Sequence, residues 1–440
     1  MAIRVVALTR PTGANLYRIN PSRVIVPANK TISSHFGAYF QPIRYAKVLV
    51  YPMSLGIYIQ VPFCQTKCTY CNFHTGVVSS ERFAPYAAAV QTEIRERRTR
   101  LSSTGVALPD SLAAKTVDTL YFGGGTPSLL DPAHLGAILR AIRETFAHDF
   151  REVTLEADPE TVDAQKAEAW AAAGINRISF GVQSFSDVEL KAAGRMHRRA
   201  NVHRAVPILH AAGIRNISFD LIAGLPHQTP ESWRNSLDEL IQLAPQHVSI
   251  YLLEVDEGSR LGSEILRGGT KYSASAVPSD DTMAESYDLA RAMLATAGYE
   301  HYEISNFAKP GFESRHNRKY WRREPYLGFG AGAHSFSGQQ RWANAHDAAA
   351  YVQSIAAGKI PIEQLETVST SQALEEELFL GLRQLAGIDL NRLQSFYGVS
   401  VKDRFTSLES SGLIQRDGPI VRLAPQHLSI SNEVFVELMR

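Results

Sequence analysis

The chain has 440 residues, of which 45% are hydrophobic, and a formal net charge of +1. This length allows one large globular domain with one or two small modules, and the apolar content is that of an ordinary folded protein. No uninterrupted apolar stretch reaches the roughly 20 residues that a membrane-spanning helix needs, so we expect no membrane span.

The first 52 residues form a basic segment with seven Lys and Arg side chains and no acidic one, and the first acidic residue is Glu81. Such a segment resembles an organellar transit peptide. The alternative is a start placed upstream of a true one at Met53, which we favour because residues 21–52 show no amphipathic helical stripe. We therefore predict an extension outside the functional core and a cytoplasmic location. A transit peptide would instead predict the mitochondrial matrix.

The remainder of the chain is mildly acidic, with 38 Lys and Arg against 44 Asp and Glu. A surface with this balance repels the phosphates of nucleic acids. We therefore expect no nucleic-acid partner.

From Met53 onward, short β-rich runs alternate with helical patterns. The predicted helices include Asp131–Phe146, Thr161–Ala173, which stops before Gly174 as a helix C-cap should, and Glu231–Ala244 with one apolar stripe. Repeated β–α units predict an α/β fold, a partial (β/α)6 barrel over residues 53–300, with chemistry where the strands end. The predicted strands are Gly56–Val61, Thr119–Phe122, Glu152–Glu156, Arg177–Gly181, Asn216–Ile222 and His247–Leu253.

All three cysteines of the chain lie in one loop after the first predicted strand, as Cys64, Cys68 and Cys71. An odd number at such close spacing does not fit a disulfide framework. Three thiolates are one short of the four that usually close an iron–sulfur cluster, so the spacing predicts a [4Fe-4S] cluster with one iron open to a non-protein ligand. The alternative is a zinc site completed by His74. We prefer the cluster because zinc sites usually pair their cysteines across two turns.

Glycines and polar side chains follow the next strands. The second strand runs into Gly123-Gly-Gly-Thr-Pro127, which forms either a tight turn or a loop whose amides approach a ligand. Later strands end in Glu156, Gln183 and Asp220, and Arg195 follows in a helical region. Each alone would be a cap or a surface group. Together they predict one polar site for a carboxylate, an ammonium and a ribose.

A basic aromatic motif, His316-Asn-Arg-Lys-Tyr-Trp321, follows the barrel within a connecting segment over residues 301–360. We expect a strand over 302–307 to place this motif as a loop against the barrel. A neutral imidazole is a common axial ligand of heme iron, and Tyr320 and Trp321 are suited to cover a porphyrin face. Arg315, Arg318 and Lys319 would then meet its propionates. The alternative is a basic surface turn with two buried aromatic rings.

The last part of the chain, residues 361–440, predicts a small separate module. Leu374, Leu378, Leu382 and Leu385 form a helical stripe, two more short helices follow, and residues 413–423 form a hairpin. These elements predict a winged-helix-like unit. Its charges are balanced, so we expect a lid or a docking surface rather than a DNA-binding unit.

At the cysteine loop the chain resembles the radical S-adenosylmethionine (SAM) superfamily, with Tyr70 as the aromatic residue before the third cysteine. The resemblance implies that SAM binds the open iron, and that an electron donor reduces the cluster so that SAM is cleaved. By the same resemblance the cofactor-binding residues are Tyr58, Tyr70, Gly124, Gly125, Thr126, Glu156, Gln183, Arg195 and Asp220.

From Gly56 nearly to the end, the chain is similar to the oxygen-independent coproporphyrinogen III oxidase-like family. The segments that carry this similarity are residues 58–64, 178–184, 194–197 and 219–226. Gln60 departs from the family, which commonly has histidine at that position.

The oxidases of this family carry a further cysteine two residues after the third, where this chain has Phe73. The heme chaperones of the family lack that cysteine and carry an H-N-x-x-Y-W motif, which His316–Trp321 matches. The resemblance therefore implies a chaperone that binds heme through His316, Tyr320 and Trp321, and passes it to an unidentified acceptor protein. The alternative is an oxidase that decarboxylates coproporphyrinogen III in porphyrin biosynthesis. Whether SAM is cleaved in turnover stays open.

Overall fold

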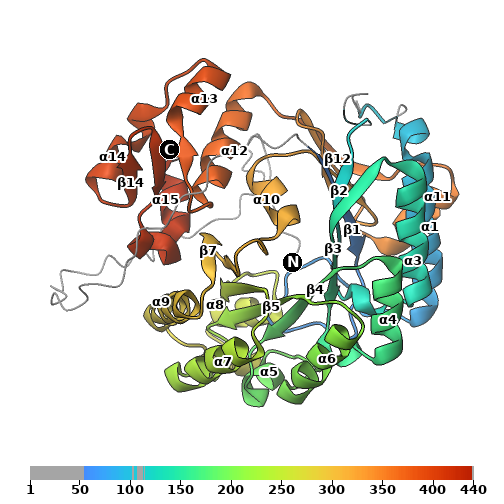
Figure 1. Ribbon diagram of the computed structural model, residues 1–440, viewed down its shortest axis with the longest axis horizontal. Helices are drawn as coiled ribbons and strands as arrows, with labels where there is room; N and C mark the ends of the chain where they lie inside the picture. Colours follow the sequence, from blue (N-terminus) through green and yellow to red (C-terminus); the bar gives the residue numbers. More distant parts are fainter. Residues whose placement is uncertain (1–53, 102–103, 107–111, 113, 439–440) are drawn as a thin grey trace. The chain divides into compact units, whose positions relative to one another are not determined.

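Six parallel strands form the centre of the computed structural model, which describes residues 54–101, 104–106, 112 and 114–438. They follow each other in sequence order across the sheet, so the predicted partial (β/α)6 barrel is confirmed (Figure 1). These strands are β1 (Leu55–Val61), β2 (Val117–Gly124), β3 (His148–Ala157), β4 (Arg177–Gln183), β5 (Asn216–Ala223) and β6 (His247–Leu252). The basic extension over 1–52 lies outside the described residues.

The sheet continues beyond these six strands on both sides, which the sequence analysis did not predict. Next to β1 lies β9 (Tyr326–Phe329), also parallel, followed by the antiparallel β10 (His334–Phe336), β11 (Gln340–Asn344) and β12 (Ile362–Thr367). Next to β6 lie the antiparallel β8 (Asn306–Ala308) and β7 (Glu300–Glu303). In the described part of the chain this twelve-stranded sheet ends at β12 and β7 and does not close on itself.

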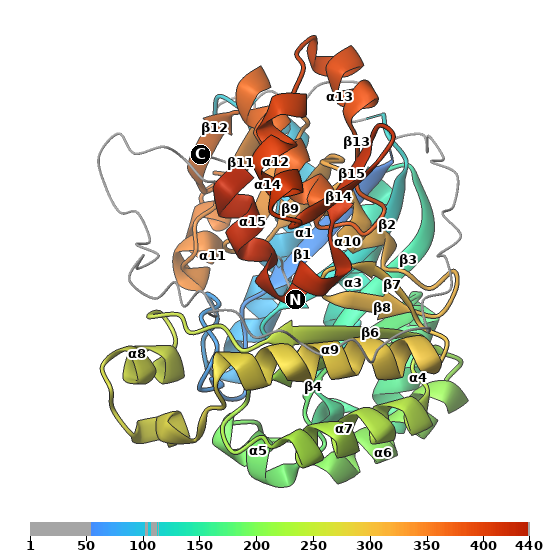
Figure 2. The same ribbon diagram turned by 90° about the vertical axis from the view of Figure 1, so that its left-hand side faces the viewer.

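Helices cover the outer face of the sheet (Figures 1 and 2). They include α1 (Phe83–Leu101), α3 (Pro132–Thr145), α4 (Ala164–Ala173), α5 (Asp187–Ala192), α6 (Arg199–Ala211), α7 (Pro230–Leu243), α9 (Asp280–Thr296) and α11 (Ala348–Ala356). The short helix α8 (Arg260–Leu266) lies beside the cysteine loop instead, where the amide of Leu261 donates to the carbonyl of Thr69 (2.8 Å). The predicted helices are present, with ends that differ from the predicted ones by at most three residues. For example, α4 begins at Ala164 because Asp163 caps it by accepting from the amide of Lys166. It ends at Gly174, whose φ of +99° favours glycine.

The two faces of the strands differ in polarity because successive side chains point to opposite sides. Outward-facing residues such as Ile57, Leu120 and Phe122 are completely buried against the helices. Their neighbours Tyr58, Thr119 and Tyr121 face inward. The barrel interior is therefore lined with polar and aromatic groups, several of which hydrogen-bond to a neighbour. The polar groups include Glu152, Thr154, Glu156, Arg177, Ser179, Ser218, Asp220, His247 and Ser249.

The C-terminal module has the predicted helices and hairpin. Its helices are α12 (Thr370–Leu382), α13 (Leu390–Tyr397), α14 (Thr406–Ser410) and α15 (Ser431–Leu438), and its small sheet is ordered β13 (Ile388–Asp389), β15 (Ile420–Leu423), β14 (Ile414–Asp417). The module is hydrogen-bonded to β7, since the amide of Leu385 donates to the carbonyl of Tyr302. The boundaries that we set at residues 300 and 360 remain predictions.

None of the helices in the described ranges combines the length and the apolar character that crossing a membrane requires.

Candidate functional site

The cysteine loop connects β1 to the helices that follow, at the carboxyl ends of the parallel strands. Cys64, Cys68 and Cys71 are partly exposed, and none of them forms a disulfide. The loop is held by backbone hydrogen bonds from Cys64 to Gly76 (3.0 Å) and from Cys71 to Cys68 (3.4 Å). Burial raises the pKa of the Cys64 and Cys71 thiols. The residues therefore fit a soft, thiolate-binding metal centre that takes the proton off each thiol when it binds.

The arrangement of these cysteines differs from that of a zinc site. Across the described residues, no three or more His, Cys, Asp or Glu side chains converge closely enough to hold a metal ion. His74, the fourth ligand of the zinc alternative, lies against His346 with 4.2 Å between ring centroids. Ligands of one zinc ion must converge on a single point, whereas cysteines of a four-iron cluster each bind a different iron. Among the described residues, His74 therefore does not join the cysteines in a preformed zinc site.

The glycine loop after β2 packs directly on the cysteine loop. The amide of Gly125 donates to the carbonyl of Val61 (2.8 Å), and that of Thr126 donates to the carbonyl of Phe63 (2.7 Å). A Cβ atom on Gly125 would lie 2.4 Å from the oxygen of Phe63 and 3.0 Å from the sulfur of Cys64. Only glycine therefore allows this approach.

Glu156, at the end of β3, accepts hydrogen bonds from the glycine loop and from β2. Its two carboxylate oxygens accept from the amide of Gly124 and from the hydroxyl of Tyr121, each at 2.9 Å. The carboxylate thus ties the inner face of β2 to the turn that follows it. These two contacts account for a Glu at the end of this strand.

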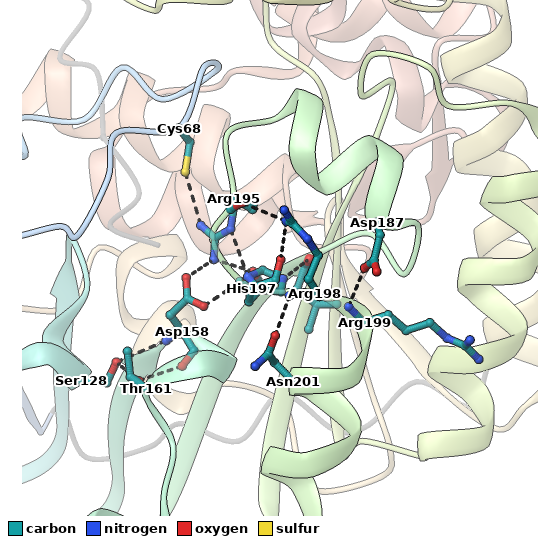
Figure 3. A network of polar contacts seen from close by, with 12 residues as sticks. Cys68, Ser128, Asp158, Thr161, Asp187, Arg195, His197, Arg198, Arg199 and Asn201 are labelled. Atoms are coloured by element: carbon teal, nitrogen blue, oxygen red, sulfur yellow. Dashed lines mark hydrogen bonds and ion pairs between the residues drawn. The ribbon is translucent and has the colours of Figure 1, made fainter.

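Arg195 connects the cysteine loop to the ends of β3 and β4 (Figure 3). Its guanidinium lies 3.4 Å from the sulfur of Cys68, and it donates to Asp158 (2.6 Å) and to the carbonyl of Gly181 (2.9 Å). Burial alone would raise the pKa of Asp158, but Arg195 and His197 together lower it to about 2. Asp158 is therefore a carboxylate at neutral pH, paired with a fixed cation.

The other residues predicted for SAM lie on the same inner face. A Cβ atom on Gly181 would meet the amide of Gln183 at 2.7 Å and the guanidinium of Arg195 at 3.4 Å, so these two side chains are neighbours. Gln183 has a φ of +64°, in the left-handed region, which turns it out of the β4 strand. Tyr58 and Asp220 lie deeper in the interior. Burial raises the pKa of the Asp220 carboxyl, and Tyr70 packs in a small apolar cluster near α8.

The His-Asn-x-x-Tyr-Trp motif is a helix, α10 (Arg315–Trp321), and not the loop that we predicted. The segment before it forms the two short strands β7 and β8 instead of one strand. Glu152 caps the helix by accepting from the amides of Arg315 (2.9 Å) and His316 (3.0 Å). The N-cap is Ser314, whose hydroxyl accepts from the amide of Asn317 (3.2 Å), so a local cap and a charged group from β3 together stabilise this short helix.

The structure does not bring α10 to the cysteine loop. His316 lies beside Gly56 and Thr119, near the starts of β1 and β2, whereas the cysteine and glycine loops follow their ends. Five residues separate Thr119 from Gly124, which at roughly 3.3 Å per residue places the two sites about 16 Å apart along the strand. The motif and the loops thus occupy opposite ends of the barrel interior.

His316 is buried, with both ring nitrogens hydrogen-bonded. Nδ1 lies 3.0 Å from the hydroxyl of Thr119, and Nε2 lies 2.9 Å from that of Tyr320. Burial, and secondarily the charge of Lys319, lower the pKa of His316 to about 3, so the imidazole is neutral. Lys319 itself pairs with Asp118 (2.9 Å) and Glu324 (3.3 Å).

Asp158, His197, Tyr121 and Glu152 were missed by the sequence analysis, although a signal for two of them was present. Asp158 follows Glu156 by two residues, and His197 follows Arg195 by two. Side chains two apart in a strand share a face, so Asp158 belongs with Glu156 at the end of β3.

Comparisons with known proteins match both the barrel and the C-terminal module of this chain. The radical SAM superfamily matches residues 58–240, and the HemN C-terminal domain matches residues 368–426. The protein named heme chaperone HemW from Bacillus subtilis is 35% identical over 384 residues, covering 86% of this chain and 97% of that protein. A bovine protein named radical S-adenosyl methionine domain-containing protein 1, mitochondrial, is 32% identical and covers 87% of each chain.

Among solved structures, the coproporphyrinogen III oxidase HemN from Escherichia coli, described as a radical SAM enzyme, superposes with a TM-score of 0.74. The match covers 88% of this chain and 90% of that one at 20% identity, so it establishes the fold alone. The superfamily implies a [4Fe-4S] cluster and SAM, which the free cysteines and the glycine loop fit. The chain therefore belongs to the radical SAM superfamily and, within it, to the family of the proteins named heme chaperone HemW.

Proposed function

We propose that the protein is a heme chaperone that binds a [4Fe-4S] cluster and SAM, binds heme, and passes the heme to an acceptor protein. The observation that carries this proposal is the match to 97% of the length of a relative with that name. The discriminating residues agree with it, because Phe73 stands where the oxidases carry another cysteine and α10 contains the complete motif.

At the cluster end of the barrel, Cys64, Cys68 and Cys71 would hold three of the four irons. The amides of Gly124 and Gly125 would face the methionine part of SAM. Arg195 and Gln183, which are neighbours, would meet its carboxylate and ribose. When bound and reduced, the cluster supplies the electron that cleaves SAM in this superfamily.

At the other end, His316 would be the axial ligand of heme iron. Burial keeps this imidazole neutral, which leaves a lone pair on one nitrogen for a metal. The indole N–H of Trp321 is buried, and within the described residues it has no hydrogen-bond partner, so a donor is available to a ligand there. Nε2 of His316, which lies beside the hydroxyl of Tyr320, would hold the iron. Arg315 and Arg318 would meet the propionates, whereas Lys319 is already paired with Asp118 and Glu324.

The C-terminal module covers this helix. The guanidinium of Arg383 lies 4.4 Å from the ring centre of Trp321, and Glu376 accepts from Arg323 (2.7 Å) just beyond α10. We therefore propose that heme enters as the module moves away from α10. The module would then act as a lid, in keeping with its balanced charge.

An oxygen-independent coproporphyrinogen III oxidase is the second candidate, favoured by the fold match to HemN. Phe73 argues against it, because it removes the further cysteine of the oxidases. An electron donor is a partner in either case. Bacterial relatives favour the cytoplasm, and the mitochondrial relative favours the matrix.

Anaerobic reconstitution of the cluster, followed by a heme titration read by absorbance and a parallel turnover assay with coproporphyrinogen III, tests the proposal. Stoichiometric heme binding without a decarboxylated product is the expected result. Product formation with only weak heme binding would establish the oxidase instead. Transfer is then tested by mixing the heme-loaded protein with a heme-free cytochrome and following the heme spectrum.

A further inference from the structure

Arg195 is held by a network of buried groups that neither the motif nor the family match assigns (Figure 3). One oxygen of Asp158 accepts from its guanidinium (2.6 Å), and the other lies 3.1 Å from Nδ1 of His197. The side chains of Arg195 and Asp158 are each 13% exposed, and that of His197 is fully buried. The same guanidinium lies 3.4 Å from the sulfur of Cys68, so the network ends at a predicted cluster ligand.

The imidazole of His197 is fixed from both sides. Nε2 lies 3.1 Å from the carbonyl oxygen of Val182 in β4. Nδ1 has a second neighbour, the Nε of Arg195 at 3.4 Å, but the carboxylate is closer and accepts only. The imidazole therefore contacts the Asp158 carboxylate and the Arg195 guanidinium on one side and the Val182 carbonyl on the other. The ring thus holds the carboxylate against β4.

The backbone of Asp158 is fixed as well. Its amide donates to the hydroxyl of Ser128 (3.2 Å), which also accepts from the hydroxyl of Thr161 (2.7 Å). Ser128 lies in the 3-10 turn that begins directly after the glycine loop. The carboxylate therefore has a fixed position relative to both the glycine loop and the end of β4.

We propose that Asp158 and His197 are positioning residues that hold the Arg195 guanidinium against Cys68 and toward the SAM carboxylate. The inference rests on the proposed binding of a cluster and SAM. Groups behind a ligand commonly fix its orientation and tune the metal centre. Without Asp158, the buried Arg195 guanidinium would have no negative charge to offset the cost of its burial. We therefore expect it to turn toward solvent.

The reduction potential of the cluster separates positioning from a simple charge effect, because the two predict opposite signs. A cation and a hydrogen bond at a cluster sulfur stabilise the reduced, more negative cluster. If Asp158 acts through Arg195, Asp158→Asn shifts the potential to more negative values, as Arg195→Met does. If Asp158 acts only as a nearby negative charge, its removal shifts the potential to more positive values.

The experiment uses the full chain with a reconstituted cluster, a redox titration read by electron paramagnetic resonance, and a SAM titration. We expect Asp158→Asn and Arg195→Met each to weaken SAM binding by about tenfold or more. The double variant should bind SAM no more weakly than Arg195→Met alone. A further loss in the double variant, or a positive potential shift in Asp158→Asn, would overturn the proposal.

Two variants of His197 test the same network if Asp158→Asn does not fold. In His197→Asn the amide N–H takes the place of Nδ1, whereas in His197→Gln it takes the place of Nε2. We expect His197→Asn to keep the wild-type SAM affinity and reduction potential, and His197→Gln to weaken SAM binding and shift the potential to more negative values. Equal behaviour of the two variants would contradict a positioning role for the Nδ1 side of His197.

The matched control is Asp149→Asn, at the other end of β3. Asp149 pairs with Arg151 at the same distance of 2.6 Å, but both side chains are 61% exposed. Neither the potential nor the SAM affinity should change in this variant. If the wild-type protein takes up no cluster, the proposed function itself is wrong. If the wild-type protein takes up a cluster but Asp158→Asn behaves like it, only the positioning role is wrong.

Discussion

The imidazole of His316 stacks on the ring of Tyr121, with 5.3 Å between the ring centroids and 28° between the planes. The hydroxyl of Tyr121 in turn donates to Glu156, whose other oxygen holds the amide of Gly124. Two side chains therefore separate the proposed heme ligand from the glycine loop. The two ends of the barrel interior are in continuous contact although they lie far apart along the strands.

Tyr121→Phe should weaken SAM binding and leave heme binding unchanged. The substitution keeps the stacked ring but removes one of the two hydrogen bonds to Glu156. A net hydrogen bond contributes about 1 kcal/mol, so the dissociation constant for SAM should rise about fivefold. Isothermal titration of the reconstituted protein measures it. An unchanged SAM affinity would show that Glu156 does not depend on Tyr121.

His316→Ala should lower heme affinity and leave the cluster spectrum intact, because the imidazole lies at the opposite end of the barrel from the cysteines. Heme titration by absorbance checks this, with His203→Ala as a control, since His203 is a half-exposed histidine on α6. Tyr320→Phe is the companion variant. It frees Nε2 of His316 without removing the ring, so its heme affinity should be equal or higher. Unchanged heme binding in His316→Ala would reject the ligand assignment.

Cys68→Ser should lose the cluster but keep heme binding. A serine hydroxyl is a poor ligand for iron in place of a soft thiolate. Iron and sulfide analysis, together with the cluster absorbance, measure the loss. A variant that retained the full iron content would contradict the assignment of the cysteine loop.

The stability of the protein should fall as the pH drops below that at which a free histidine titrates. His316 has an ordinary pKa of 6.5 that burial lowers to about 3 in the folded chain, so the unfolded chain binds more protons between these values. The free energy of unfolding therefore rises with pH over this interval, by at most about 1.4 kcal/mol per pH unit for this group. Denaturant unfolding between pH 4 and 7 measures the slope. It should be shallower in His316→Asn, and an identical slope would contradict the prediction.

Glu376→Gln should speed heme association by loosening the contact between the C-terminal module and the residues after α10. Glu376 pairs with Arg323 (2.7 Å) and Arg341 (2.8 Å), both outside the module. Glu377→Gln is the matched control, because its partner Arg392 lies inside the module. Stopped-flow mixing with heme compares the two rates. If both variants bind at the wild-type rate, the module does not limit heme entry.

The sequence predicted the six parallel strands because their apolar runs are short and regularly spaced. The alternation of Thr119 and Tyr121 with Leu120 and Phe122 also indicated that β2 has one polar face. The barrel interior became recognisable only once all six strands were aligned side by side. The cysteine and glycine loops were predicted as one site because parallel strands end on the same side. Local sequence alone was sufficient for that prediction.

The strands beyond the first six were not predictable in the same way. β9 pairs with β1 across about 270 residues, and nothing in either segment specifies the other as its partner. The helical form of α10 has a local signal in its N-cap Ser314, which we did not use, and a second acceptor, Glu152, supplied from a distant strand. The second contact could not be predicted from the local pattern.

Helix α10 connects β8, next to one end of the sheet, with β9, next to β1 on the other side. It is capped by β3, and its His316 bonds to a threonine 197 residues earlier in the chain. Contacts at such long sequence separation form slowly, because the intervening chain must first be ordered. During synthesis, the segment that we assign to heme would therefore be completed only after the strands bearing the cysteine and glycine loops had assembled. A newly made chain would then form its cluster-binding site before its heme-binding site.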